Sequence, residues 1–205
     1  MVLRLGLFAL VLFISSVLLG CAAIPLSSKY TAPKERPITL DQYYSKGKSY
    51  LGYKEEVLQK NKNKEVTQKT ITINTQYGDI LVDYYDHKSN DDDLIFVFPL
   101  LGGKPIVSQH FAKYFSDRGI DSAILRRNDD FKNPAFFNKI EKMLRENVVR
   151  DRIAIDFFEK VYHKKDFAGF GVSRGAINLA MTAGADPRLK YLSLIHISEP
   201  TRLRR

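Results

Sequence analysis

The chain has 205 residues, of which 44% are hydrophobic and 27% are charged. This balance is ordinary for a soluble protein, and the length is sufficient for one domain with a sizeable core. The formal net charge is +9, and part of it lies in Lys60, Lys62 and Lys64. Because these lysines alternate with asparagines and lack interleaved aromatic residues, we expect a solvated face and no nucleic-acid partner. No metal-ligand spacing and no dinucleotide-binding fingerprint occurs, so we expect neither a metal nor a cofactor.

The first twenty residues have the pattern of an export signal. A single basic residue, Arg4, precedes an apolar run over residues 5–14, and small residues follow. This run is too short and wrongly flanked for a membrane-spanning helix. Residues 18–21, Leu-Leu-Gly-Cys, resemble the lipobox of bacterial lipoproteins, in which the cysteine receives lipid and becomes the mature N-terminus. The alternative is a plain signal peptide with an incidental cysteine.

Cys21 is the only cysteine of the chain, so it has no disulfide partner even in an oxidising compartment. The lipoprotein resemblance implies that lipid on Cys21 anchors the protein to a membrane of the bacterial cell envelope. In such lipoproteins an aspartate directly after the cysteine resembles a signal for retention in the inner membrane. This chain has Ala22 at that position, which favours the outer membrane as its location. Residues 21–37 are rich in Ser, Pro and Lys without periodicity, and they predict a tether between the anchor and the globular domain.

The first elements of the domain are a short helix and a hairpin. Thr39 or Asp41 is a suitable cap for a helix that carries Tyr43, Tyr44, Tyr50 and Leu51. From residue 66 the hydrophobic period changes to two, and a turn around Gly78 separates two alternating runs. This pattern predicts an antiparallel hairpin.

The next segments predict parallel strands joined by helices. Residues 94–99 form a continuous apolar run typical of a strand buried on both faces. Residues 107–118 have helical spacing and end at Gly119, and a second strand follows over residues 122–125. Strand, helix and strand at this spacing form a βαβ unit, whose two strands are parallel. Beyond it the pattern predicts one long helix or two helices up to Val161, a strand over residues 167–170, and a helix over residues 174–184.

Residues 171–175, Gly-Val-Ser-Arg-Gly, match G-x-S-x-G, the nucleophile elbow. A serine at a sharp turn between a strand and a helix has a strained backbone, and Gly171 and Gly175 leave no side chain to collide with the neighbouring elements. The turn also places Ser173 at the N-terminus of the next helix, where free N–H groups stabilise developing negative charge. The sequence therefore predicts Ser173 as a nucleophile.

A glycine turn follows the first parallel strand. Residues 99–103, Pro-Leu-Leu-Gly-Gly, resemble the oxyanion loop of α/β-hydrolases, although Leu101 stands where that family often has a histidine. The departure is tolerable because the oxyanion donor is a backbone N–H group. We assign the oxyanion hole to the N–H of Gly102 or Gly103 together with that of Arg174. The alternative is a plain turn between a strand and a helix.

Taken together, residues 66–189 resemble the first half of the domain found in the α/β-hydrolase family. The expected fold is α/β, with a mostly parallel sheet, an N-terminal antiparallel hairpin and an incomplete C-terminal part. The resemblance implies that Ser173 attacks an acyl carbonyl, and that a histidine and an acid later in the chain complete the triad in the order Ser, acid, His.

The residues after Ser173 do not supply these partners convincingly. The only acids are Asp186, which we interpret as structural, and Glu199, and the only histidine is His196. Residues 192–202 resemble one translated frame of a transposase adaptor used for sequencing libraries. We therefore interpret residues 38–191 as a partial domain and residues 192–205 as an artefactual tail, and we expect this chain to be inactive. Upstream, His110 is nearest to a plausible pocket, but we interpret it as a polar helix residue.

The sequence thus predicts a membrane-anchored serine hydrolase that acts, as the complete gene product, on an ester, thioester or amide in the cell envelope. The substrate would be a small molecule or an acyl group. Two alternatives stay open: a non-catalytic lipoprotein that uses the fold for binding, and an acyltransferase or peptidase on the same fold.

Overall fold

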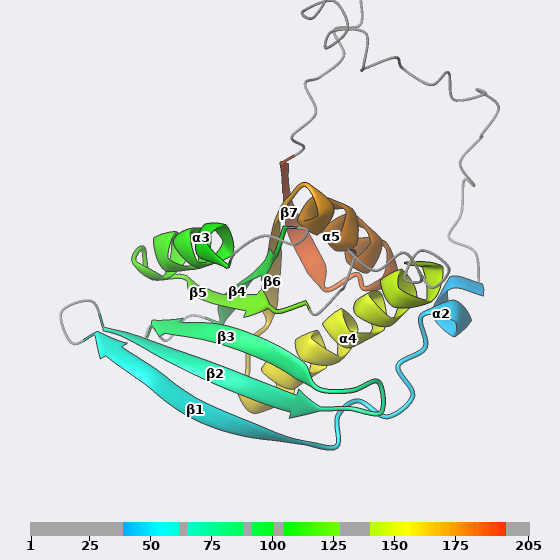
Figure 1. Ribbon diagram of the computed structural model, residues 1–205, viewed down its shortest axis with the longest axis horizontal. Helices are drawn as coiled ribbons and strands as arrows, with labels where there is room; N and C mark the ends of the chain where they lie inside the picture. Colours follow the sequence, from blue (N-terminus) through cyan, green and yellow to red (C-terminus); the bar gives the residue numbers. More distant parts are fainter. Residues whose placement is uncertain (1–38, 62–64, 88–91, 101–104, 128–139, 196–205) are drawn as a thin grey trace, which may run out of the picture. The chain divides into compact units, whose positions relative to one another are not determined.

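The computed structural model describes residues 39–61, 65–87, 92–100, 105–127 and 140–195. All of them belong to the unit Ile38–Arg205. The expected signal, the tether and Cys21 lie outside the described residues, as do Gly102, Gly103, His196 and Glu199. Figure 1 shows the elements, which in chain order are α2 (Thr39–Tyr43), β1 (Gly52–Asn61), β2 (Val66–Asn74), β3 (Ile80–His87), β4 (Asp93–Phe98), α3 (Ile106–Ser116), β5 (Asp121–Leu125), α4 (Ile140–Val161), β6 (Asp166–Val172), α5 (Arg174–Ala185) and β7 (Leu189–Ile195).

The strands form one sheet in the order β1-β2-β3-β5-β4-β6-β7. The pairs β1–β2, β2–β3 and β3–β5 are antiparallel, and the pairs β5–β4, β4–β6 and β6–β7 are parallel. The predicted hairpin is β2–β3, and Gly78 adopts a φ of 87° in its turn. The predicted βαβ unit is β4-α3-β5. The α/β fold class expected from the sequence is therefore confirmed, with a parallel half that carries Ser173 and an antiparallel half that begins the domain.

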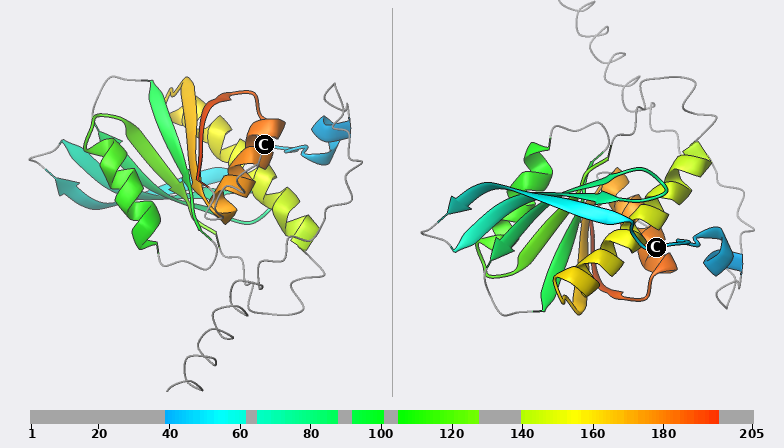
Figure 2. Two further views of the ribbon diagram at one scale, coloured as in Figure 1. Left: turned by 90° about the horizontal axis from the view of Figure 1, so that it is seen from above. Right: turned by 90° about the horizontal axis from the view of Figure 1, so that it is seen from below.

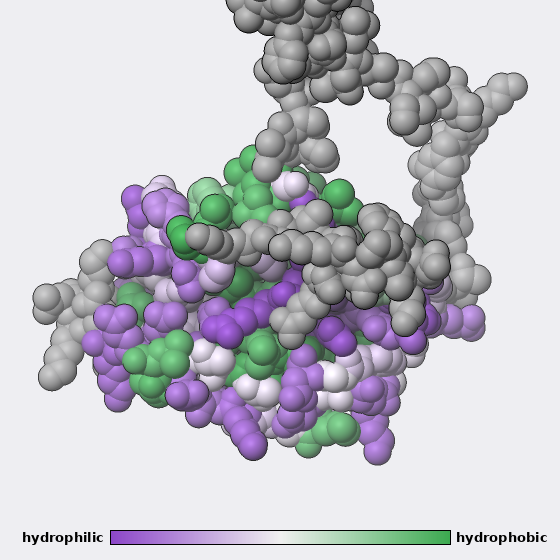
Figure 3. Space-filling model, in the orientation of Figure 1, coloured by the Kyte–Doolittle hydropathy of each residue, from purple (hydrophilic) through white to green (hydrophobic). Residues whose placement is uncertain are grey.

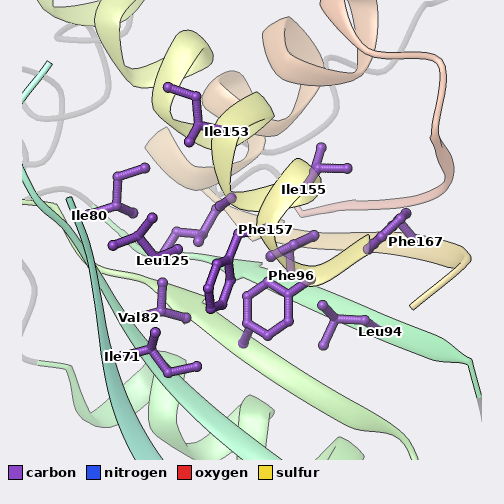
Figure 4. Packing of buried hydrophobic residues seen from close by; sticks show 14 of the residues in the cluster. Ile71, Ile80, Val82, Leu94, Phe96, Leu125, Ile153, Ile155, Phe157 and Phe167 are labelled. Atoms are coloured by element: carbon purple, nitrogen blue, oxygen red, sulfur yellow. The ribbon is translucent and has the colours of Figure 1, made fainter. Parts of the chain in front are cut away.

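Helices cover both faces of the sheet: α3 lies on one face, and α4 and α5 lie on the other (Figure 2). Alternate residues of β4 serve the two layers, because successive side chains of a strand point to opposite faces. Phe96 and Phe98 belong to the core cluster under α4 and α5, whereas Val97 belongs to the smaller cluster under α3. Figure 4 shows Phe96 and Phe157 among the buried residues of the larger cluster, and the ring centroids of Phe96 and Phe158 of α4 lie 5.6 Å apart. Burial of each such side chain stabilises the fold by about 1.5–3 kcal/mol.

Two parts of the antiparallel half differ from the sequence prediction. Strand β1 was not expected, because its run Lys-Glu-Glu over residues 54–56 and an irregularity of register between Val57 and Gln59 obscure the alternation. It is an edge strand, where charged side chains protect against pairing with other chains. The short helix is wrong beyond Tyr43, where α2 ends, because Gly47 has a φ of 59° that no helix accepts.

The parallel half follows the prediction more closely. Of the two possibilities for residues 134–161, the structure shows a single helix over the described part, α4, which begins at Ile140. Strand β7 continues past Tyr191 to Ile195 and so includes the first four residues of the expected tail. All residues of β7 except Leu189 are exposed. It pairs with β6 on one side and lies at the end of the strand order, where no described strand pairs with its other side.

Candidate active site

Ser173 lies between the last residue of β6 and the first residue of α5. Its backbone has φ 54° and ψ −119°, and the other positive-φ residues besides glycine in the described ranges are Glu65 and His163. A non-glycine residue held in such a region costs on the order of 1–3 kcal/mol, which the surrounding structure must offset. The turn over residues 171–175, which we call the Ser173 turn, therefore has the strained geometry that a nucleophile elbow requires.

The two glycines of the motif are needed because neighbouring backbone lies against them. A Cβ atom on Gly171 would lie 2.6 Å from the carbonyl carbon of Gly175. A Cβ atom on Gly175 would lie 2.2 Å from the carbonyl oxygen of Phe98, the last residue of β4. Both distances are shorter than any normal contact, and the obstacles are backbone atoms. The spacing G-x-S-x-G thus reflects the closeness of β6, α5 and β4 at one point.

The end of β4 is the nearest neighbour of the Ser173 turn in the sheet. In the parallel pair of β4 and β6, Phe98 lies opposite Gly171, so Pro99 and Leu100 leave β4 beside the turn. Gly102 and Gly103 follow two and three residues after Leu100 and lie outside the described residues. Arg174 is the first residue of α5, so its N–H group faces out of the N-terminal end of that helix. The N–H of Ser173 itself donates to the carbonyl oxygen of Ile195 at 2.9 Å.

The described histidines lie elsewhere. His87 ends β3 beside the first residue of β5, where its N–H donates to Asp121 at 2.7 Å, and His163 precedes β6. Both therefore lie at the edge of the sheet opposite the Ser173 turn. His110 lines a groove of about 320 Å³ with residues of β1, β2 and β3. In the sheet, β5 and β4 lie between these strands and β6. No described histidine is shown in contact with Ser173.

Asp186 is structural, as expected from the sequence. It is the C-cap of α5, at the end remote from Ser173. Burial raises the pKa of its carboxyl group, but hydrogen bonds from Arg188 outweigh this effect and hold the pKa below its ordinary value. Arg188 Nε donates to Asp186 Oδ1 at 2.9 Å, and Arg152 Nε lies 3.4 Å from Asp186 Oδ2. Asp186 therefore caps the far end of the helix that begins beside Ser173, and its hydrogen bonds join it to Arg188 and not to the Ser173 turn.

Sequence reasoning missed a buried polar pair at the C-terminal end of the parallel strands, where Ser173 also lies. Arg127 lies just beyond β5 and Asp151 lies inside α4, and they form an ion pair with both side chains almost fully buried. Asp151 sits on the apolar face of α4 near Val148 and Ile155, which are buried too. A carboxylate on the apolar face of a predicted helix is the signal that could have revealed the pair, because such a charge needs a buried partner.

The surroundings of the Ser173 turn are partly apolar. Ile177, in the first turn of α5, is 49% exposed, and Leu194 and Ile195 at the end of β7 are also exposed. Figure 3 shows apolar surface gathered toward α5 and β7. Within the described ranges, no three His, Cys, Asp or Glu side chains cluster as a metal site would require. In the same part of the chain, every helix is too short or too polar to cross a bilayer.

Comparisons with known proteins identify the fold and not the family. No protein-family model matches the chain, and no curated protein matches it. Among solved structures, a cold-adapted esterase from an Arctic intertidal metagenomic library is similar with a TM-score of 0.54 and 18% identity. The match covers 70% of this chain and 63% of the esterase.

Two acetyl xylan esterases are similar as well. The protein from a Paenibacillus species has a TM-score of 0.55 and 14% identity, over 82% of this chain and 63% of the esterase. The protein from a Thermoanaerobacterium species has a TM-score of 0.55 and 12% identity, over 80% of this chain and 59% of the esterase. The chain therefore spans less than two thirds of the length of these esterases, and the likeness at this identity concerns the α/β-hydrolase-like fold alone.

Proposed function

We propose that the complete gene product is a serine hydrolase of the α/β-hydrolase type, with Ser173 as the nucleophile. The observation that carries the proposal is the strained backbone of Ser173 at a turn from a parallel strand to a helix, with the end of β4 against that turn. In a nucleophile elbow, a turn of this kind lifts the serine hydroxyl above the sheet edge, and the N–H of the residue after the serine is one donor of the oxyanion hole. The similar fold of three esterases supports an ester as the substrate, and a thioester or amide is attacked in the same way.

In this mechanism the Ser173 oxygen forms a bond to the acyl carbon while its proton passes to the histidine that the family resemblance implies. The N–H of Arg174 and that of Gly102 or Gly103 stabilise the oxyanion, and loss of one such donor typically costs about 2.7–4 kcal/mol. The leaving alcohol takes the proton from the histidine, and the acyl group stays on Ser173. Water then attacks the acyl-enzyme and releases the acid.

A fluorophosphonate probe tests this proposal because it forms an adduct only with an activated serine. The complete gene product, recovered from the source genome, should be labelled at Ser173, and Ser173→Ala should abolish the adduct. Ser45→Ala is the matched control, since Ser45 is exposed and far along the chain from the turn. Absence of labelling at Ser173 would favour the non-catalytic alternative, in which the fold serves binding. Transfer of the acyl group from the acyl-enzyme to an added alcohol or amine, in preference to water, would indicate an acyltransferase.

We further propose that the present chain is catalytically incomplete. The support is the resemblance of residues 192–202 to translated adaptor sequence. Burst-phase acylation measured with an activated ester should show little or no turnover for this chain and normal turnover for the complete product. Turnover at an equal rate by both proteins would contradict the proposal.

The lipid anchor on Cys21 is a separate proposal that rests on the lipobox resemblance. A bacterium that expresses the gene and is fed an alkyne-labelled fatty acid should incorporate the label into the protein, and the protein should fractionate with the outer membrane. Cys21→Ser should release it from the membrane, whereas Ser27→Ala in the adjoining tether should leave it bound. An unlabelled, freely secreted protein would indicate a plain signal peptide.

A further inference from the structure

The end of strand β5 is tied to two helices by a buried polar cluster. The guanidinium of Arg127 forms an ion pair with Asp151 of α4, and the side chains are 4% and 1% exposed. The hydroxyl group of Thr182 in α5 donates a hydrogen bond to Asp151 Oδ2 at 2.8 Å. One carboxylate therefore connects β5, α4 and α5, and α5 is the helix that begins at the Ser173 turn.

The same arginine contacts the end of β4. The guanidinium carbon of Arg127 lies 6.0 Å from the centroid of the Phe98 ring, within the range of a cation–π contact. The backbone of Phe98 is the surface against which Gly175 fits without room for a Cβ atom. Phe98 is thus held from two sides, by Arg127 through its ring and by the Ser173 turn through its carbonyl group.

These contacts form a closed circuit. It runs from Arg127 through Asp151 and Thr182 into α5, along that helix to Gly175, across to Phe98, and back to Arg127. Apart from the step along α5, each link joins residues that are distant in the sequence. A displacement of the end of β4 relative to α5 must therefore break the ion pair, the hydrogen bond or the ring contact.

Burial is unfavourable for the charges of this pair. Burial raises the pKa of the Asp151 carboxyl group although Arg127 and Thr182 act to lower it. Buried ion pairs of this kind are often no more stabilising than apolar side chains of similar volume. The neighbouring residue provides a contrast, because Arg126 pairs with Asp83 at 2.5 Å but is 43% exposed and joins only the adjacent strand β3.

We propose that Arg127 is a positioning residue that holds the end of β4, and with it the start of the oxyanion loop, in a single register against the Ser173 turn. This role rests on the proposed function, since it matters to catalysis only if the turn is an active site. A misplacement of about 1 Å at such a site can lower the rate on the order of a hundredfold. Asp151 and Thr182 act through Arg127 and α5 and do not touch the substrate.

Hydrogen exchange of this chain tests the proposal without any need for activity. The reporters are the amides of Ser173 and Ala176, which donate to Ile195 and to Ser173 at 2.9 Å each. In Arg127→Lys and in Asp151→Asn, these amides should exchange about tenfold faster relative to the core amides of β2. Arg126→Lys is the matched control and should leave the ratio unchanged.

The outcomes are distinct. Equal acceleration of all amides would show that the pair supplies stability only, and an unchanged ratio would show that the turn does not depend on Arg127; either result overturns the proposal. If the single variants fail to fold, the apolar double variant Arg127→Met with Asp151→Leu keeps the volume without a buried charge. In this variant the proposal requires faster exchange at the turn while the core amides of β2 stay protected.

The fluorophosphonate experiment separates this inference from the proposed function. In the complete gene product, Arg127→Lys should slow labelling of Ser173 about tenfold at a temperature where the variant is folded, whereas Arg126→Lys should not. Unlabelled wild-type protein with a selective exchange effect at the turn would reject the hydrolase and retain the positioning contact. Normal labelling with no effect of Arg127→Lys on either measurement would reject the positioning role and retain the hydrolase.

Discussion

The two ends of helix α5 are built very differently. At its N-terminus, Ser173 has a φ of 54°, and a Cβ atom on Gly175 would lie 2.2 Å from the backbone of Phe98. At its C-terminus, a Cβ atom on Gly184 would meet nothing within 4 Å. There Asp186 has an ordinary extended backbone and closes the helix with ion pairs. One helix therefore begins in a strained, tightly packed turn and ends in a conventional polar cap.

This difference shows where the fold holds strain. A strained serine and a glycine that cannot be replaced occur together at the sheet edge, where a reacting group is useful. The opposite end has only the usual requirements of a helix terminus, with Arg188 and Arg152 around the C-cap carboxylate. Strain of this kind persists only where the surrounding structure enforces it, and it clusters at functional sites. Substitutions at the two ends should therefore have effects of different size and sign.

The largest effect is expected for Gly175→Ala. The added methyl group collides with backbone atoms of Phe98 that cannot rotate away, so β4 and α5 must separate. We expect a loss of about 3 kcal/mol or more in the free energy of unfolding, at the upper end of overpacking effects. Denaturant unfolding of the purified chain measures it. A loss below about 1 kcal/mol would show that the contact between β4 and the turn is looser than described.

The next effect concerns the C-terminal cap and its dependence on pH. Arg188→Gln removes charged hydrogen bonds to Asp186, Asp156 and Glu159 and should destabilise the chain by about 2 kcal/mol at neutral pH. Arg188 holds the pKa of the Asp186 carboxyl group below its ordinary value, against the effect of burial. This contribution is therefore present above the unfolded-state pKa of about 4 and is lost as the pH falls through the lower folded-state pKa.

The gap between wild type and Arg188→Gln should accordingly narrow as the solution is acidified below about pH 4. Urea unfolding at a series of pH values from neutral to acid provides the measurement. A gap that stays constant or widens in acid would contradict the assignment of the carboxylate as a charged cap.

A gain in stability is expected for Ser173→Gly. Glycine accepts the backbone of this position without strain, and relief of about 1–3 kcal/mol exceeds the entropic cost of about 0.5–1 kcal/mol that glycine brings. The net gain should be about 1 kcal/mol, seen as a higher melting temperature. Ser173→Ala retains the strain and is the control, which should show no such gain. If both variants behave alike, the strain at Ser173 is not present in solution.

The smallest effect is expected for Gly184→Ala. This glycine is exposed within α5 and has open space around it. Alanine in a helix is more favourable than glycine by roughly 0.5–1 kcal/mol, so a small stabilisation should appear in thermal unfolding. Because Gly184 lies in the same helix as Gly175, the opposite signs of the two substitutions would locate the tight contact at the N-terminal end.

Much of the fold was predictable because its signals are local. The period of two in β2 and β3, the apolar run of β4 and the helical spacing of α3 each come from neighbouring residues. Strand β1 was missed because an exposed edge strand has no buried apolar face, and its charged run interrupts the alternation of apolar and polar residues.

The candidate site was predictable only in part for the same reason. The G-x-S-x-G spacing reports the sterics of five consecutive residues, so Ser173 and both glycines could be named in advance. The pairing of Arg127 with Asp151 could not, because it joins a strand end to the middle of a helix 24 residues later. Likewise, nothing in the sequence marks Phe98 as the neighbour of Gly175, because any apolar residue is compatible with a buried strand.

By itself the sequence determined the type of most elements and the position of the sharp turn at Ser173, because hydrophobic period and backbone sterics act over a few residues. Only the tertiary structure decided that β5 lies between β3 and β4, that β4 ends against Gly175, and that a buried ion pair ties β5 to α4 and α5. These features depend on how segments that are distant in the sequence pack together. The physical reason is that the same local pattern of strands and helices is compatible with other strand orders and other tertiary contacts.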